Sequence, residues 1–373
     1  MSEALHIEEL REAVRGVFAD RAGEAIEIPG EEGRGLDRAL WQQMAELGWL
    51  GLCVPEAQGG LGLGQAHLGV FYEELGRQLA SVPILETMMA AMAIAAHGDA
   101  ETRSRWLPAI MAGECLVAVV LPDQGSAMIG SGNRVSGVFD HVPLADVATL
   151  LLVPVRSAAR IGLALLPADL PGIIVTARPT VDLTRSIGRV ELDAVEIAPA
   201  AMLALDEAAW DALADHAAMG LACDAVGGAA ALLELTVDYL KVREQFGRPI
   251  GSFQALKHRA ADWKVKIEAT AALARHAGAL LSAGSADASA AASSAKAYAV
   301  DTYAAFCGDA VQLHGGMGFT WEHPCHVFLK RAKLSQQLYG SSTAHKERAA
   351  RFAFDQIEED SLAQAGTPHH QTV

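Results

Sequence analysis

Short apolar runs between about residues 116 and 200 separate two stretches of the chain that have helical periodicity. The runs are bounded by Gly, Pro and Asp, as strands usually are, and they cover residues 117–122, 149–153, 161–166 and 172–175. Residues 190–197 alternate apolar and polar side chains, the pattern of a half-buried strand. Because no helix intervenes between these strands, we expect a compact β-barrel or sandwich and disfavour a doubly wound nucleotide-binding sheet.

Apolar residues recur at three- and four-residue steps on both sides of the strand region. On the N-terminal side this spacing predicts a first helix through Ile7, Leu10, Val14 and Val17, and further helices near 40–47, 71–77, 88–96 and 106–111. On the C-terminal side a long helix is predicted by an apolar stripe at Leu232, Leu235, Tyr239, Val242 and Phe246. Gly weakens a helix unless packing requires it, so we expect close helix contacts at Gly220, Gly227 and Gly228.

The order of these elements predicts an α+β protein with more than one domain. We expect an N-terminal helical domain at residues 1–115, a middle β-domain at 116–200, a C-terminal helical bundle at 201–358 and a flexible tail at 359–373. Within the bundle, the sequence Gly-Ser-Ala-Asp at 284–287 predicts a turn between two helices.

Composition narrows the classes of function. The formal net charge of −16 argues against nucleic-acid binding, because phosphates are bound by clustered Lys and Arg. The five cysteines are scattered and form no Cys-x-x-Cys pair, so we expect neither a metal site nor disulfides. The N-terminus lacks the apolar core of a secretory signal, and no apolar run reads as a membrane span. We therefore expect a cytoplasmic protein.

Three groups of segments resemble the signatures of one enzyme family. Residues 239–254 read Tyr-Leu-Lys-Val-Arg-Glu-Gln-Phe-Gly-Arg-Pro-Ile-Gly-Ser-Phe-Gln, and residues 312–320 read Gln-Leu-His-Gly-Gly-Met-Gly-Phe-Thr. Shorter matches lie at 47–49, 54–56, 59–62 and 74–77. Over nearly its whole length the chain resembles the acyl-CoA dehydrogenases. That resemblance implies an N-terminal helical domain, a middle β-domain, a C-terminal four-helix bundle and the cofactor FAD.

The resemblance also implies which residues hold the flavin. In this family FAD lies across a subunit interface, and its pyrophosphate needs a fixed cation, a role that the guanidinium of Arg243 can fill. Gly247 and Pro249 are expected to turn the chain after the long helix. The full set of expected FAD contacts is Arg243, Gln245, Phe246, Phe253, Gln312, Leu313, Gly315 and Gly316.

The residue expected to abstract the substrate proton is absent. Most family members carry a Glu just before Gly-Thr, and an ungapped alignment places Tyr339 at that position, followed by Gly340 and Ser341. A phenol with a pKa near ~10 is a poor base at neutral pH. Other members place the base on the helix before the Arg segment, where this chain has Ala217; its neighbours Asp215 and His216 would point elsewhere around that helix.

The β-domain departs from the family pattern as well. Val120 and Ala127 stand where the family usually has a flavin-contacting Thr and an Asp. The family's Trp-Ile-Thr strand has no clear equivalent, because the local sequence at 137–146 is shorter and different. The losses therefore fall on the isoalloxazine and proton-abstraction side, whereas the adenosine and pyrophosphate side is intact.

Losses grouped in this way are typical of a mixed oligomer. The chain resembles the base-less subunits of heterotetrameric (α2β2) acyl-CoA dehydrogenases from actinobacterial sterol side-chain breakdown. That resemblance implies a paralogous catalytic partner that supplies the Glu, and a steroid or branched acyl-CoA substrate. Two alternatives stay open: a self-sufficient enzyme with Tyr339, His216 or Asp215 as a displaced base, and a non-catalytic acyl-CoA-binding scaffold.

Overall fold

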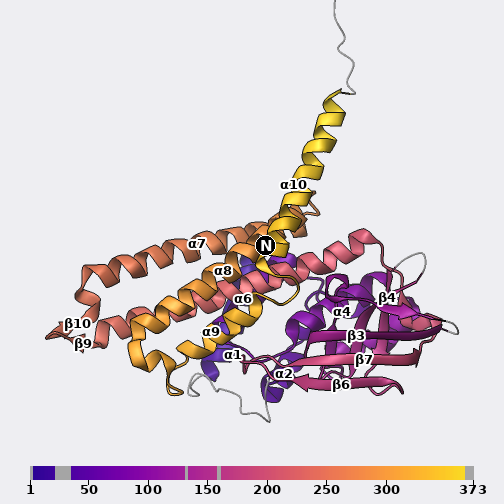
Figure 1. Ribbon diagram of the computed structural model, residues 1–373, viewed down its shortest axis with the longest axis horizontal. Helices are drawn as coiled ribbons and strands as arrows, with labels where there is room; N and C mark the ends of the chain where they lie inside the picture. The colour runs from indigo at the N-terminus through magenta and orange to yellow at the C-terminus, as the bar shows by residue number, and fades with distance from the viewer. Residues whose placement is uncertain (1–2, 22–34, 131–132, 158–160, 366–373) are drawn as a thin grey trace, which may run out of the picture.

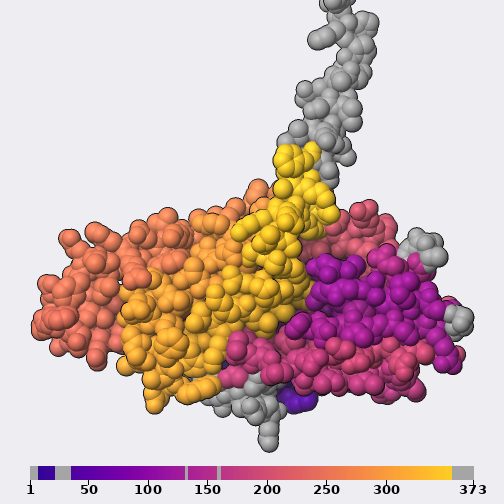
Figure 2. All heavy atoms as spheres, in the orientation of Figure 1, coloured from indigo at the N-terminus to yellow at the C-terminus, as the bar shows by residue number. Residues whose placement is uncertain are grey.

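The structure is a computed structural model that describes residues 3–21, 35–130, 133–157 and 161–365 (Figure 1). It confirms the α+β fold class and the order of helices, β-domain and helices. In Figure 1 the strands lie at one end of the molecule, and the long C-terminal helices extend toward the other. Figure 2 shows that the two parts form one continuous body on this face, from which the last helix projects.

In the part of the chain that the structure describes, five α-helices precede the sheet: α1 Glu3–Asp20, α2 Arg38–Glu46, α3 Gln65–Arg77, α4 Ile84–His97 and α5 Ala100–Met111. Two of them begin at an Asp whose carboxylate accepts a backbone N–H three residues on, at 2.9 Å for Asp37 and 2.7 Å for Asp99. Such caps satisfy amides that the helix itself leaves unpaired. The apolar periodicity located all five of these helices, although α3 and α5 each begin six residues before the predicted start.

The middle domain is a mixed sheet with the strand order β6-β7-β3-β2-β4-β5-β8, in which β1 pairs with β4. The strands are β1 Val117–Val119, β2 Ala127–Ile129, β3 Arg134–Pro143, β4 Leu150–Arg156, β5 Ile161–Pro167, β6 Ile173–Arg178, β7 Ile187–Glu196 and β8 Met202–Leu203. The sequence did not predict β2 or β3. In β3 the alternation of side chains is broken by register shifts on either side of Phe139, and His141 has a positive φ of 59°.

Strand β4 is buried on both faces, which explains its unbroken apolar sequence. Leu150 and Leu152 pack with the helices α4 and α5, whereas Leu151, Val153 and Val155 pack inside the sheet domain against residues of β3 and β7. The strand is hydrogen-bonded to β1 and β2 in parallel and to β5 in antiparallel orientation. It therefore ties the N-terminal helices to the interior of the sheet.

The C-terminal part is built on α6 Glu207–Val242, α7 Gln254–Ser282, α8 Ala288–His314, α9 Cys325–Ser335 and α10 Ser342–Ala365. The turn predicted at 284–287 separates α7 from α8, and α10 continues past residue 358. Contrary to the sequence expectation, α6 is long and apolar enough to cross a membrane by length and composition. However, 78% of its apolar window is buried inside the protein, as in the core helix of a globular domain.

Glycines allow α6 to approach its neighbours closely, as predicted. A Cβ at Gly227 would overlap the carbonyl oxygen of Glu73 on α3, and one at Gly228 would overlap the Tyr303 hydroxyl on α8. A Cβ at Gly220 would lie 2.6 Å from Leu85 Cδ1. Because backbone cannot retreat as a flexible side chain can, the α3–α6 contact at Gly227 is the least tolerant of the three.

We expect Gly227→Ala to lower the free energy of unfolding by more than about 2 kcal/mol, because α3 and α6 must separate to admit the methyl group. The matched control is Gly308→Ala in α8, where a Cβ meets nothing within 4 Å. That control should be neutral or up to ~1 kcal/mol stabilising, because Ala is the better helix former. Urea unfolding followed by circular dichroism measures both, and equal effects would contradict the packing assigned to Gly227.

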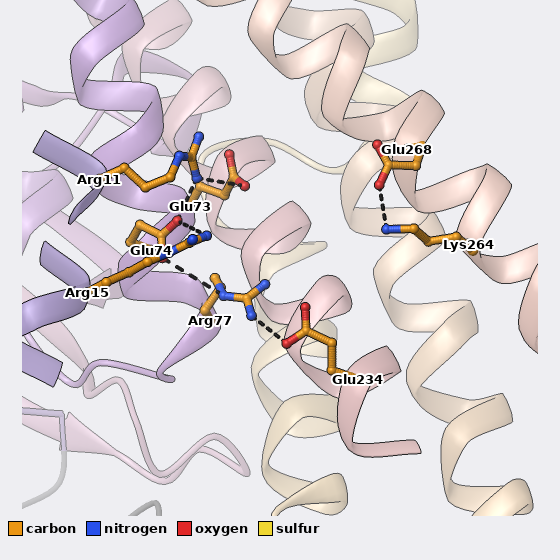
Figure 3. Close-up of polar contacts among 8 residues, drawn as sticks. All are labelled: Arg11, Arg15, Glu73, Glu74, Arg77, Glu234, Lys264 and Glu268. Carbon is orange, nitrogen blue, oxygen red and sulfur yellow. Dashed lines mark hydrogen bonds and ion pairs between the residues drawn. The ribbon is translucent and has the colours of Figure 1, made fainter. Parts of the chain in front are cut away.

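A buried carboxylate joins α1 to α3 (Figure 3). Glu74 is 2% exposed and accepts hydrogen bonds from Arg11 Nη1 at 2.5 Å and from Arg15 Nε and Nη2, both at 2.9 Å. Charge-assisted contacts of this kind are stronger than neutral ones, and a buried ion needs them to offset its desolvation. Arg77, on the same helix, lies 3.9 Å from Glu74 Oε2 through its Nε and pairs more closely, at 2.6 Å, with the exposed Glu234 of α6.

The substitution Glu74→Gln should destabilise the protein by about 3 kcal/mol, because it leaves guanidinium groups of α1 without their buried anion. Glu234→Gln is the control, since its carboxylate is 64% exposed and such pairs contribute ~1 kcal/mol or less. The two variants are compared by the shift of the midpoint of urea unfolding, provided that the m-value is unchanged. A Glu234→Gln variant as unstable as Glu74→Gln would show that burial of Glu74 is not what matters.

Candidate functional site

The end of the bundle farthest from the sheet is a two-stranded hairpin between α6 and α7 (Figure 1). Its strands are β9 Glu244–Gln245 and β10 Arg248–Pro249, and the two residues between them, Phe246 and Gly247, have positive φ of 53° and 76°. Two consecutive residues with positive φ make the tight turn whose twist suits a hairpin. The chain thus turns at Gly247, as the sequence predicted.

The side chains of this hairpin face outward. Phe246 is 91% exposed and meets Phe253 edge to face at 6.1 Å, and the Arg248 guanidinium lies 4.1 Å above the Phe253 ring. Gln245 donates only to its neighbour's backbone, Glu244 O, at 2.9 Å. Among the described residues, the guanidinium of Arg243 makes no hydrogen bond or ion pair, although its backbone N–H and C=O are both bonded. The Arg243 charge is therefore available to an external anion.

The second predicted segment lies beside α6, a few residues before the hairpin. Tyr239 stacks on His314 at 4.6 Å between ring centroids and donates to its carbonyl oxygen at 3.3 Å. This contact brings the exposed Gln312 and the buried Leu313 next to the last turn of α6. The structure therefore places the two segments, which are about 70 residues apart in sequence, at the same end of the bundle.

Two exposed glycines follow Gln312 and leave open space. Gly315 has a φ of +62° and a ψ of −140°, a conformation that essentially requires Gly. Gly316 lacks a positive φ, and a Cβ at either position would meet nothing within 4 Å. Packing within the chain therefore does not explain Gly316. An open backbone beside an unpaired guanidinium fits the approach of a phosphate-bearing ligand.

The position that the sequence predicts for the catalytic base holds a buried phenol. Tyr339 is 3% exposed, and its hydroxyl lies 3.0 Å from Glu86 Oε1, to which it donates, and 3.3 Å from Val119 O. Burial raises the pKa of Tyr339 well above its ordinary value, and the nearby Glu86 raises it further. The phenol is thus neutral at physiological pH and holds its proton, which is the opposite of what a general base requires.

Neither of the neighbouring candidates has the properties of a displaced base. Desolvation lowers the pKa of His216 to about 4, and its ring nitrogens lie 2.8 Å from Tyr72 Oη and 2.7 Å from Gln65 Oε1. Because an amide oxygen can only accept, Nδ1 carries the proton and Nε2 accepts from Tyr72. Asp215 accepts from Arg348 Nη1 at 2.5 Å, so its carboxylate is already paired.

Glu86 is the residue that sequence reasoning missed. It lies in α4 among apolar neighbours, and burial raises the pKa of its carboxyl group. The available signal was a lone carboxylate within the apolar sequence of residues 84–97, because such a group is buried only with a partner. Nothing local identifies that partner, since Tyr339 is 253 positions away in sequence.

The interior beside Tyr339 is almost filled. The cavity there has a volume of about 40 Å³ and is lined by side chains that include Tyr72, Leu85, Glu86, Arg185, Asp224 and Leu338. Small-molecule sites usually measure about 300–1,000 Å³, so this space suits one or two water molecules. Its polar wall is closed by a buried ion cluster in which Asp224 accepts from Arg331 Nη2 at 2.5 Å and from Arg185 Nη2 at 2.9 Å.

In the sheet, Val120 and Ala127 are both completely buried within the apolar interior. At these two positions the chain has gained core contacts where the family pattern has polar groups. Residues 137–143 belong to the intact strand β3, whose Phe139 is also buried there. The β-domain therefore has apolar, buried side chains at the two positions where the resemblance implies a Thr and an Asp.

Comparisons with known proteins agree with this architecture. A family model described as "Acyl-CoA dehydrogenase, N-terminal domain" matches residues 6–114, and "Acyl-CoA dehydrogenase, C-terminal domain" matches 208–354. Acyl-CoA dehydrogenase IpdE2 of Mycobacterium tuberculosis is 35% identical over 336 residues, covering 89% of this chain and 92% of the relative.

Two solved structures are also similar to this chain. A variant of the Tcur3481-Tcur3483 steroid ACAD matches with a TM-score of 0.85 at 33% identity, over 96% of this chain and 100% of that one. The ChsE4-ChsE5 complex from Mycobacterium tuberculosis matches with a TM-score of 0.84 at 27% identity, over 99% of both chains.

The burial of His216 predicts a pH dependence. The unfolded imidazole, with a pKa near ~6.5, gains a proton that the folded one does not bind until the pH reaches about 4. The contribution of His216 to the free energy of unfolding is therefore fully present above pH ~6.5. It falls by about 3 kcal/mol as the pH is lowered toward 4. Burial also lowers the pKa of His345 to about 4, so both histidines contribute. His216→Gln should remove the share of His216, up to about 3 kcal/mol, in urea unfolding at pH 7 and pH 4.5, and an unchanged pH profile would contradict the assignment.

Proposed function

Because the chain belongs to the acyl-CoA dehydrogenase family, we propose that it is the subunit of a heteromeric, FAD-dependent acyl-CoA dehydrogenase that supplies half of the flavin site and no catalytic base. In the proposed assembly, bound FAD would supply the acceptor for the hydride that leaves the β-carbon of the thioester. This chain binds the adenosine and pyrophosphate of the flavin. A paralogous subunit supplies the Glu that takes the α proton.

The observation that carries this proposal is the exposed hairpin end of the bundle. Arg243 presents an unpaired cation among the described residues, and the Gly315-Gly316 backbone beside it is open. A guanidinium can bind phosphate oxygens through two parallel hydrogen bonds. The exposed ring of Phe246 and the ring of Phe253 offer apolar surface for an adenosine. The proposed contacts are Arg243, Gln245, Phe246, Phe253, Gln312, Leu313, Gly315 and Gly316.

The position of this surface supports a partner. Helix α6 has 36 residues and is therefore ~54 Å long, and it separates the hairpin from the sheet of its own chain (Figure 1). A flavin held at the hairpin therefore meets the β-domain of another subunit. A partner that retains the polar flavin-facing groups and the Glu would complete both halves of the site.

Similar proteins indicate the class of assembly and substrate. Both solved structures described above carry the names of two chains, and one of them is a steroid ACAD. We therefore propose an α2β2 complex in the cytoplasm that acts on a steroid or other bulky acyl-CoA. The self-sufficient alternative has no support in the geometry, because Tyr339, His216 and Asp215 are each engaged in the protein interior.

Replacement of the phosphate-binding cation tests the half-site. In the complex purified with its paralogous partner, Arg243→Gln should weaken FAD binding by about 10- to 100-fold, because charge-assisted hydrogen bonds are lost. Lys241→Gln is the matched control, since Lys241 pairs with Asp238 at the surface of the same helix end. Fluorescence titration of the apo-complex with FAD gives the affinities, and wild-type affinity in Arg243→Gln would exclude the proposed role.

Reconstitution tests the division of labour. The isolated chain, supplied with FAD, should not bleach the flavin under anaerobic conditions when an acyl-CoA thioester is added, because its only group at the base position is a neutral phenol. Addition of a paralogue that carries the catalytic Glu should produce bleaching. Thioester oxidation by this chain alone at ordinary enzymatic rates would refute the proposal.

A further inference from the structure

Tyr339 contacts elements from all three parts of the chain. Its hydroxyl meets Glu86 of α4 and Val119 O of β1, so the ring reaches both the N-terminal helices and the sheet. Its carbonyl oxygen accepts from Lys296 Nζ of α8 at 3.0 Å and lies 2.8 Å from His345 Nε2 of α10. A single residue between α9 and α10 thus links the N-terminal helices, the sheet and the C-terminal helices.

A buried ammonium group fixes the backbone at this point. Lys296 is 0% exposed and donates to the carbonyl oxygens of Leu338, Tyr339 and Gly340. Its three donors match three acceptors, which satisfies a cation that would otherwise be costly to bury. Tyr339 and Gly340 have positive φ of 51° and 95°. For Tyr339 this conformation is strained, so the Lys296 contacts hold the ring in a position that the backbone alone disfavours.

The fixed ring lies where a thioester would have to enter. A group at the base position works only within hydrogen-bond reach of the proton that it removes, so a substrate α-carbon must lie next to residue 339. In this chain that space contains the Tyr339 ring, the Glu86 carboxyl group and a cavity of about 40 Å³. An acyl group of any size cannot fit there without displacing the ring.

We propose that Tyr339 closes the thioester site of this chain, because its ring occupies the space that an acyl group would need. Its hydroxyl group also connects α4 and β1 to the C-terminal helices through hydrogen bonds. The residue at the base position thus connects the three domains, and contacts with Glu86 and Lys296 hold it in place. The inference rests on the proposed function, in which this chain supplies no catalytic base.

Cavity creation tests whether the ring fills space. Tyr339→Ala removes the ring, whereas Tyr339→Phe keeps it and removes only the hydroxyl. The ring belongs to an apolar cluster that includes Met89, Leu121 and Leu338, and apolar cavities bind small aromatic molecules. Toluene should raise the melting temperature of Tyr339→Ala by about 2–4 °C and should leave the wild type and Tyr339→Phe unchanged.

An equal toluene effect on the wild type would show that the space is already open, and no effect on a folded Tyr339→Ala variant would show that the ring does not fill it. Either result overturns the closure. The assay uses the full chain without flavin, so its outcome is independent of the proposed cofactor half-site.

Hydrogen exchange tests whether the Tyr339 hydroxyl stabilises α4 and β1. This experiment uses Tyr339→Phe and does not require the Ala variant to fold. Tyr339→Phe should accelerate amide exchange about 10-fold in 84–97 and 117–121, because the bonds to Glu86 and Val119 are lost. Tyr298→Phe is the matched control, since that ring lies at the surface of α8. Unchanged exchange in both segments of Tyr339→Phe would refute the proposed connection of α4 and β1 through the Tyr339 hydroxyl.

Discussion

The close approach of α3 and α6 is the constraint on which the rest of the molecule depends. At Gly227 and Gly76 the backbone of one helix touches that of the other, since a Cβ at either position would overlap a carbonyl oxygen across the interface. This contact lets α6 pass through the core as one unbroken helix and places Asp224 within reach of Arg185 and Arg331. The positions of the hairpin at one end and of the sheet at the other follow from the course of α6.

The two ends of the bundle have opposite physical characters. At the hairpin, side chains that usually prefer to be buried or paired are exposed, and the glycines beside them have free space. At Tyr339 the reverse holds, because its hydroxyl and carbonyl groups are enclosed and both find partners. Exposed aromatic and cationic groups beside open backbone are typical of a binding surface. Enclosed and satisfied polar groups are typical of a specific, rigid core.

Local sequence predicted the elements whose pattern is local. The periodicity of α4 and the apolar run of β4 are visible within a few residues, whereas β3 was missed because its register shifts interrupt the alternation. The hairpin site was predicted from a resemblance, since an exposed Arg has no pattern of its own. Glu86 and Lys296 could not be predicted, because their partners are 253 and more than 40 positions away and only the fold brings them together.

The conformation of the hairpin has a consequence for assembly. Phe246 adopts a left-handed backbone in the isolated chain, although a non-glycine residue disfavours it. The conformational cost is therefore met during folding and not at the moment of association, so the surface is preorganised. A complementary chain would therefore bind a hairpin whose conformation is already set. Any conformational change on association would have to occur in that partner chain.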